Sequence, residues 1–159
     1  MFLSGGIGPL GDLYTDGSYD SFVMVHEYTH GVSFRLARQV YTTFQGGAMG
    51  EAWSDFYGME YTIPDGAPPN GIYPTGQYWD QSWGYGGLRS RPYSTDMSVD
   101  PITFADLGHV SLSPEVHADG EIWFEALWEI RANLIAQFGE AEGRKRVRQL
   151  VMDLSLIHI

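Results

Sequence analysis

Cysteine is absent from this 159-residue chain, so no disulfide framework holds its fold together. Basic residues are also scarce: 9 Lys and Arg stand against 20 Asp and Glu, and the formal net charge of −11 argues against a nucleic-acid partner. No stretch approaches the roughly 20 apolar residues that cross a bilayer, so we predict no membrane partner. The length suits one domain with a sizeable core, and the acidity is consistent with an exported protein.

The stretch His26-Glu27-Tyr28-Thr29-His30 carries the most information in the chain, because histidine is scarce, with five in the whole sequence. Positions i and i+4 of a helix lie on the same face, so His26 and His30 can bind one metal ion together. Glu27 lies one step round the helix, where it can reach a water on that ion without binding the ion. Two ligands and one base are what H-E-x-x-H supplies to a zinc hydrolase. A helix over about residues 20–38 is supported by apolar residues at helical spacing: Phe22, Val25, Thr29, Val32 and Leu36.

A catalytic zinc ion usually has a third protein ligand, and the second predicted helix, over about residues 48–62, supplies the candidates. The metzincin pattern, with a third histidine six residues after the second, fails because Leu36 stands there. Glu51 and Asp55 share a helix face, whereas Glu60 lies about 180° from Glu51. We therefore predict Glu51 as the third ligand. Asp55, one turn later, is predicted to accept the free N–H of a ligand histidine and to fix its tautomer.

These residues lie in blocks that resemble the fungalysin family of secreted zinc metallopeptidases, which are related to the thermolysin-like enzymes. The blocks run in order from about residue 20 to 153: residues 26–33, 46–55, 91–98 (Arg-Pro-Tyr-Ser-Thr-Asp-Met-Ser) and 116–123 (Val-His-Ala-Asp-Gly-Glu-Ile-Trp). The resemblance implies one zinc ion bound by His26, His30 and Glu51, with Glu27 as the catalytic residue. It also implies protein or peptide substrates, a propeptide in the full-length protein, and an extracellular location. The chain departs from the family at Phe34, where asparagine is usual, at Ala52, where glycine is usual, and in the shorter connection between His30 and Glu51.

His117 is the candidate that would stabilise the transition state of peptide hydrolysis. The sequence places it on a loop just before a long helix predicted at about 118–138, from which it would donate to the oxyanion. Thermolysin-like enzymes have a similar Val-His block, and the resemblance points to the same role. The predicted reaction is then zinc-dependent endopeptidase chemistry, with Glu27 as general base towards water and later as proton donor to the leaving amine.

The fold expected from these patterns is mainly α, the helical lobe of a thermolysin-like zinc metallopeptidase. A fourth helix is predicted at about 140–153, and residues 63–115, rich in Gly, Pro and aromatic residues, are predicted to form long loops or short strands. Residues 1–153 are expected to be a partial catalytic domain whose beginning lies upstream, because residues 1–3 are too short for a signal peptide. Residues 154–159 resemble the translation of a sequencing adapter, so His158 is not considered as a ligand.

Two alternative functions belong to other classes. A zinc aminopeptidase would also use a helical glutamate as third ligand, but its Gly-x-Met-x-Asn block is missing before His26. A non-catalytic zinc-binding or interaction domain would need no base, and Glu27 argues against it. A structural calcium ion is left open without support, since Asp12, Asp16 and Asp20 fit no calcium-loop pattern.

Overall fold

Four α-helices make up most of the part of the chain that this computed structural model describes, residues 16–38, 40–79 and 87–156. They are α1 (Ser21–Leu36), α2 (Phe44–Thr62), α3 (Val116–Phe138) and α4 (Glu140–Leu156). Short 3-10 turns lie at Gly17–Tyr19 (η1), Val40–Thr42 (η2) and Phe104–Asp106 (η4). The mainly α fold class expected from the sequence is confirmed.

Capping side chains explain why two helices begin earlier than predicted. The free N–H groups of a first helical turn need acceptors, and polar side chains just before the helix supply them. The Thr43 hydroxyl accepts from the Gly46 N–H at 3.0 Å, so α2 begins four residues before the predicted start at 48. The Glu115 carboxylate accepts from the Ala118 N–H at 3.0 Å, so α3 begins two residues before the predicted 118.

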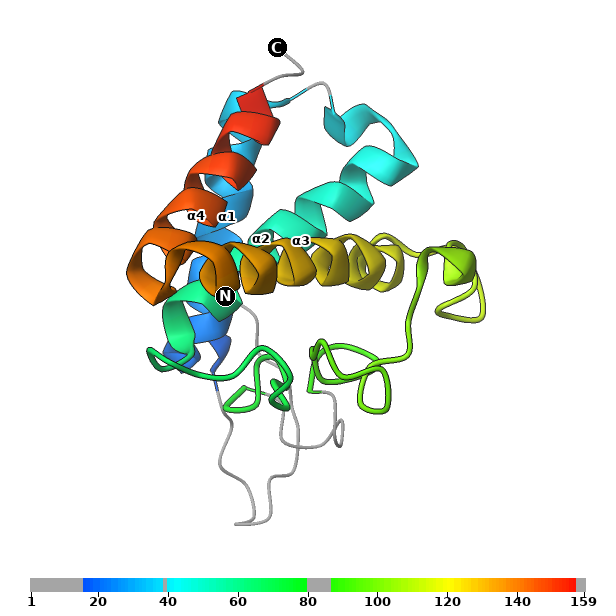
Figure 1. Cartoon of the computed structure of the whole chain (residues 1–159). Helices are drawn as coiled ribbons and strands as arrows, with labels where there is room; N and C mark the ends of the chain where they lie inside the picture. Colours follow the sequence, from blue (N-terminus) through cyan, green and yellow to red (C-terminus); the bar gives the residue numbers. More distant parts are fainter. Residues whose placement is uncertain (1–15, 39, 80–86, 157–159) are drawn as a thin grey trace.

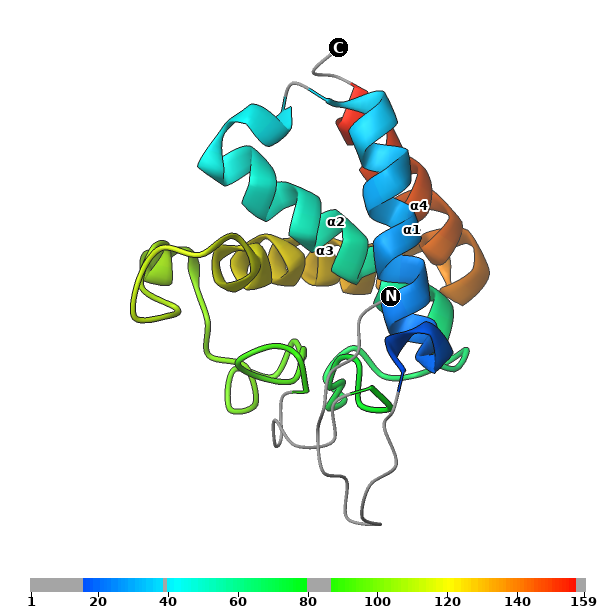
Figure 2. The same ribbon diagram turned by 180° about the vertical axis from the view of Figure 1, so that it is seen from behind.

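The helices pack around α2, which contacts both α1 and α3, while α4 packs against α3. Figures 1 and 2 show α3 crossing the direction of α1 and α4 at a steep angle. The irregular segment between α2 and α3 lies below α3 in both views. Its described residues form only isolated bridges, Tyr73 with Tyr93 and Thr75 with Gly87, which fits the expected long loops. Among the described residues, no helix is both long and apolar enough to span a bilayer.

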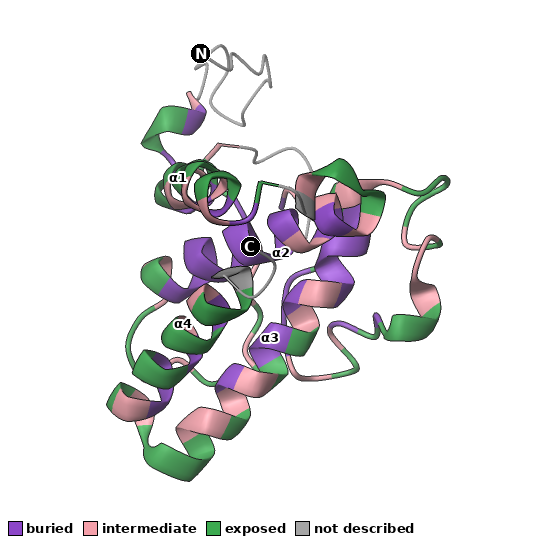
Figure 3. Ribbon diagram, turned by 90° about the horizontal axis from the view of Figure 1, so that it is seen from above, coloured by how far each residue is buried: buried purple, intermediate pink, exposed green. Residues whose placement is uncertain are grey.

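The core lies where α2, α3 and α4 face one another, as the purple faces in Figure 3 show. Three aromatic rings form its centre: Tyr93 stacks on Phe124 with ring centroids 3.5 Å apart, and Phe124 stacks on Trp128 at 5.6 Å. All three are fully buried, as are Val147 and Val151 of α4. Tyr93 comes from the irregular segment, so aromatic stacking fixes that segment against α3.

A buried ionic cluster ties the far end of α2 to α3 and α4. Glu60 accepts from Arg131 Nε and from Arg144 Nε, each at 2.7 Å, and both Glu60 and Arg131 are completely buried. The prediction that Glu60 points away from Glu51 is therefore confirmed. Glu60 therefore faces away from Glu51 and joins α2 to α3 and α4.

Candidate metal centre

Two glycines let the helices that carry the site approach one another closely. A Cβ on Gly58 of α2 would lie 2.9 Å from the Phe22 ring of α1, a distance that real Cβ contacts essentially never show. A Cβ on Gly120 of α3 would lie 2.9 Å from the Glu51 Cβ. Asp20 begins α1 by accepting from the Phe22 N–H at 2.9 Å, which sets the helical register of the histidines that follow.

Three donor atoms from α1 and α2 converge at one point. The Nε2 atoms of His26 and His30 lie 3.0 Å apart, and each lies 3.4 Å from a carboxylate oxygen of Glu51. All three ligand atoms lie within 4.8 Å of one another, and this is the one such group of three that the described residues contain. The structure thus brings together the three side chains that were predicted from the sequence as ligands.

The Glu51 carboxylate shows that this donor set suits a cation. Its Oε2 is buried and accepts no hydrogen bond from the described residues. Nitrogen atoms of His26, His117 and Arg89 surround this oxygen at 3.4, 3.4 and 3.5 Å. A buried carboxylate oxygen without a donor is costly. Two imidazoles and a carboxylate are the protein ligands of the zinc sites of many hydrolases, so these residues fit a zinc ion.

Asp55 lies behind the histidines and collects three partners. His26 Nδ1 lies 2.8 Å from one carboxylate oxygen. The Arg89 guanidinium donates to both oxygens at 2.6 and 2.8 Å, and the Tyr93 hydroxyl donates at 2.5 Å. Asp55 therefore lies where its carboxylate can orient the His26 ring through Nδ1, the contact on which its predicted role depends.

Arg89 is the site residue that sequence reasoning missed. It comes from the irregular segment, 34 positions after Asp55. Ser90 anchors this part of the segment, because its N–H and hydroxyl donate to the buried Glu121 carboxylate of α3 at 3.0 and 2.6 Å. A signal was available: Arg89 is a basic residue in a strongly acidic chain, two positions before the family-like block that begins at Arg91.

His117 lies in the first turn of α3, so its predicted place on a loop is wrong. Glu115, which caps the helix, also holds the imidazole: His117 Nδ1 lies 2.5 Å from Glu115 Oε1. The other ring nitrogen, Nε2, lies 3.4 Å from Glu51 Oε2, at the margin of the three-donor cluster. The side chain remains half exposed, with Nε2 turned towards the site.

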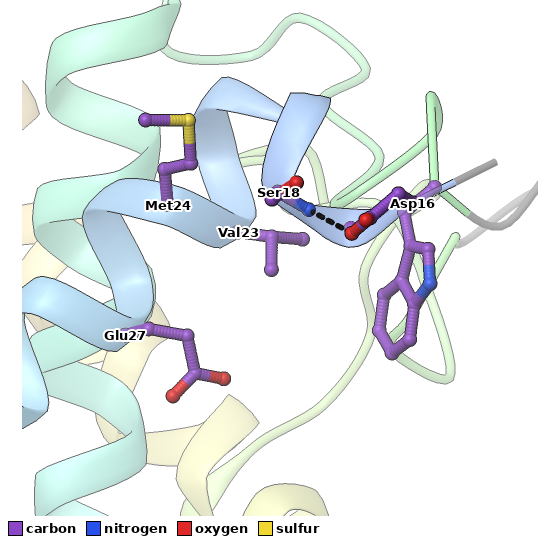
Figure 4. A pocket seen from close by; sticks show the side chains of 7 residues that line it. Asp16, Ser18, Val23, Met24 and Glu27 are labelled. Atoms are coloured by element: carbon purple, nitrogen blue, oxygen red, sulfur yellow. Dashed lines mark hydrogen bonds between the residues drawn. The ribbon is translucent and has the colours of Figure 1, made fainter. Parts of the chain in front are cut away.

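Glu27 lies on the exposed side of α1, next to a pocket of about 400 Å³. Figure 4 shows Glu27 and Val23 projecting from the same side of the helix into this space. Met24 and Trp79 add further apolar wall, and Asp16 lies at the end near η1. Trp79 comes to this pocket from the irregular segment, whereas Tyr73 of the same segment packs on Trp128.

The ionisable side chains of the cluster shift one another's pKa values strongly. Burial alone would lower the pKa of His26, but its hydrogen bonds to Asp55 and Glu51 outweigh burial and raise that pKa to about 9. Burial alone would raise the pKa of Glu51, yet the neighbouring His26 and His30 hold it well below its ordinary value. The pKa of Asp55 is likewise held low against burial, chiefly by the Arg89 charge. A cation entering the cluster would thus replace a proton on His26 and find both carboxylates ionised.

Comparison with known proteins places the chain in a family. The family model for fungalysin metallopeptidase (M36) matches residues 11–155. The chain is 35% identical over 137 residues to "Extracellular metalloproteinase 10" of Coccidioides posadasii and 37% identical over the same length to "Extracellular metalloproteinase 4" of Arthroderma otae. These alignments cover 83% of the chain but only 21% and 20% of the relatives, so it spans about a fifth of their length. On this evidence the chain belongs to the fungalysin metallopeptidase family.

Proposed function

We propose that this chain carries the catalytic zinc site of a secreted metalloendopeptidase, with His26, His30 and Glu51 as the ligands. The observation that supports it most is the convergence of two imidazoles on the Glu51 carboxylate, whose buried Oε2 has no hydrogen-bond donor among the residues that the structure describes. Three protein ligands leave a coordination position open, as catalytic zinc requires. Secretion is inferred from relatives whose names call them extracellular.

A bound zinc ion would supply Lewis-acid chemistry, polarising a peptide carbonyl and making water more acidic. Glu27 is next to the ligand His26 but is exposed, so its carboxylate is free to accept a proton from the attacking water and later give it to the leaving amine. His117 is held through Nδ1 by Glu115, which leaves Nε2 to donate to the developing oxyanion. Asp55 keeps the His26 ring in its ligand orientation.

The substrates proposed are proteins or peptides, as expected for a peptidase family. The pocket beside Glu27 has apolar walls from Val23, Met24 and Trp79, and it lies next to the proposed point of cleavage. We propose that it receives an apolar side chain of the substrate. Cleavage-site profiling on a mixed peptide library measures this preference, and equal cleavage beside charged and apolar residues would contradict it.

The central test is Glu27→Gln, which removes the base but retains size and shape. Zinc content per chain should stay at that of the unsubstituted protein, while peptide hydrolysis should fall by about 10²–10⁴-fold. Glu51→Gln makes the same change at the proposed zinc ligand on α2, and this variant should lose bound zinc as well as activity. Zinc is measured on this chain, and hydrolysis on the complete reading frame that contains it. Parent-level hydrolysis by Glu27→Gln would refute the assignment of the base.

The same pair of measurements separates the alternatives. A non-catalytic zinc-binding domain would bind zinc through the three ligands and show no turnover in the complete protein. A zinc aminopeptidase would release residues from a free N-terminus and would not cut a peptide whose N-terminus is acetylated. Cleavage inside an N-acetylated peptide therefore distinguishes the endopeptidase from both.

A further inference from the structure

The family-like block at residues 91–98 has no part in the reaction proposed above, yet it brings a polar group to the metal centre. The Tyr93 hydroxyl donates to Asp55 Oδ2 at 2.5 Å. Tyr93 is completely buried and Asp55 almost so. A hydroxyl that joins a core ring to the carboxylate facing His26 can act on that histidine through the carboxylate.

Each oxygen of the Asp55 carboxylate has two partners. Oδ2 accepts from the Tyr93 hydroxyl and, at 2.6 Å, from Arg89 Nε. Oδ1 accepts from Arg89 Nη2 at 2.8 Å and lies 2.8 Å from His26 Nδ1. Rotation of a carboxylate about its last bond is broad, so its partners and not a rotamer well set its plane. The donors on Oδ2 therefore help to determine how Oδ1 faces His26.

Tyr93 is a rigid donor. Its N–H donates to the Tyr73 carbonyl oxygen at 3.0 Å, and its own carbonyl oxygen accepts from the Tyr73 N–H at 3.2 Å. Its ring stacks on Phe124 of α3 with centroids 3.5 Å apart. Backbone pairing and ring packing thus fix the hydroxyl in front of Asp55, so the hydrogen bond forms with little further loss of conformational entropy.

Tyr93 is also a neutral donor, in contrast to Arg89. Burial, and after it the Asp55 charge, raises the pKa of Tyr93 well above its ordinary value, so the hydroxyl keeps the proton that it donates. The Arg89 guanidinium lies 3.5 Å from Glu51 Oε2 as well, so its charge acts on both carboxylates. A second cation on Asp55 would repel a zinc ion, whereas a phenol hydroxyl fixes the carboxylate and leaves its charge to act on His26.

We propose that Tyr93 is a positioning residue of the zinc site: its hydroxyl fixes the Asp55 carboxylate, which holds the His26 ring in the orientation that binds zinc. The inference rests on the proposed function, because it takes His26 as a zinc ligand. In this role Tyr93 contacts neither the metal nor the substrate. Both hydrogen bonds from Arg89 would remain without the hydroxyl, so its loss should cost less zinc affinity than loss of the Asp55 charge.

The zinc affinity of this chain, measured by competition with a chelator, tests the proposal. Tyr93→Phe should raise the Kd for zinc about 5–10-fold, below or at the lower end of the about 10–100-fold expected for Asp55→Asn. Tyr57→Phe is the matched control: it removes the hydroxyl of another buried tyrosine, which donates to the Arg148 carbonyl oxygen at 2.7 Å, and it should leave the Kd unchanged. Far-UV circular dichroism checks that each variant is folded at the temperature of the titration.

Two further readouts separate positioning from a general effect on stability. In the Asp55→Asn background, Tyr93→Phe should change the Kd less than about twofold, because the hydroxyl acts through the carboxylate. Cobalt(II) bound in place of zinc has a visible absorption spectrum that depends on the geometry of its ligands. This spectrum should change in Tyr93→Phe and stay that of the parent in Tyr57→Phe.

Three results would overturn the inference while the zinc site itself stands. They are a parent-like Kd and cobalt spectrum in Tyr93→Phe, an equal loss of affinity in Tyr57→Phe, and an undiminished effect of Tyr93→Phe in the Asp55→Asn background. A different result rejects the proposed zinc site and this inference with it: zinc binding by Glu51→Gln that is as tight as in the parent.

Discussion

The buried cluster around Glu60 offers the sharpest test of how this fold is held together. Glu60→Gln removes one negative charge that two guanidinium groups share, each through a 2.7 Å hydrogen bond from Nε. A glutamine retains one carbonyl oxygen, so it can serve one arginine, but its NH₂ group then faces the other. Arg131, completely buried, would keep only the longer contact of its Nη2 with Glu140, 3.8 Å away, so most of its charge would lose its balance.

The magnitude follows from that burial. Removing one partner of a buried ion pair costs about 3–5 kcal/mol, a large part of the about 5–15 kcal/mol by which a typical domain is stable. For a chain of this size, each 1 kcal/mol lowers Tm by about 2–4 °C, so Glu60→Gln should lower Tm by about 6–20 °C. Urea and thermal unfolding followed by far-UV circular dichroism measure both quantities. Zinc bound per folded chain should not change, because Glu60 faces away from Glu51.

Two comparisons make the result decisive. Glu142→Gln removes an acid from the exposed pair with Arg146, 2.7 Å apart, and should cost about 0.5 kcal/mol or less. Replacing the cluster together, as Glu60→Met with Arg131→Met and Arg144→Leu, should cost less than Glu60→Gln alone, since no charge then stays buried without a partner. If Glu60→Gln lost under 1 kcal/mol, the buried charges would not be the tie between α2, α3 and α4 that the distances indicate.

Three further predictions concern the site and the buried carboxyl group of Glu125 on α3. Asp55→Asn should weaken zinc binding by about 10–100-fold, measured by competition with a chelator, because the His26 ring loses its charged partner; unchanged affinity would mean that ring packing alone orients the histidine. His117→Ala should lower kcat by about 10²–10³-fold at constant zinc content, whereas a rise in KM alone would assign His117 to substrate binding. Burial, together with the neighbouring Asp100, raises the pKa of Glu125 to about 9, so the folded chain holds this proton more tightly than the unfolded chain. The contribution of this proton to the free energy of unfolding should be complete below about pH 4.5 and be lost as pH rises towards 9. The parent should therefore lose stability over that range relative to Glu125→Gln. Parallel profiles of unfolding free energy against pH would contradict this.

The features predicted correctly from the sequence depend on residues that lie close together along the chain. The helices were predicted because apolar residues recur at helical spacing, and their ends were misplaced where Thr43 and Glu115 cap the first turns. A single side-chain hydrogen bond decides such an end, and periodicity does not report it. The error at α3 also put His117 on a loop, although it lies within a helical turn.

Side-chain contacts between residues far apart in the sequence could not be predicted in this way. Arg89 reaches Asp55 only because Ser90 is held by Glu121 and Tyr93 stacks in the core. The charge of Arg89 and its place beside a family-like block mark it as a candidate, but they do not indicate which carboxylate it contacts. The same holds for Glu125 of α3, whose carboxylate accepts from the Ser94 N–H of the irregular segment at 3.4 Å.

The sequence by itself determined that His26 and His30 share one helix face, and that Glu51 and Asp55 share another, because a helix repeats every 3.6 residues. Only the tertiary structure decided that the two faces meet. Gly58 lets α1 approach α2 closely enough for the Nε2 atoms of the two histidines to lie 3.4 Å from Glu51, and Gly120 lets α3, which carries His117, approach the same residue. Helical spacing is a local property of the backbone, whereas the crossing of two helices depends on how the whole core packs.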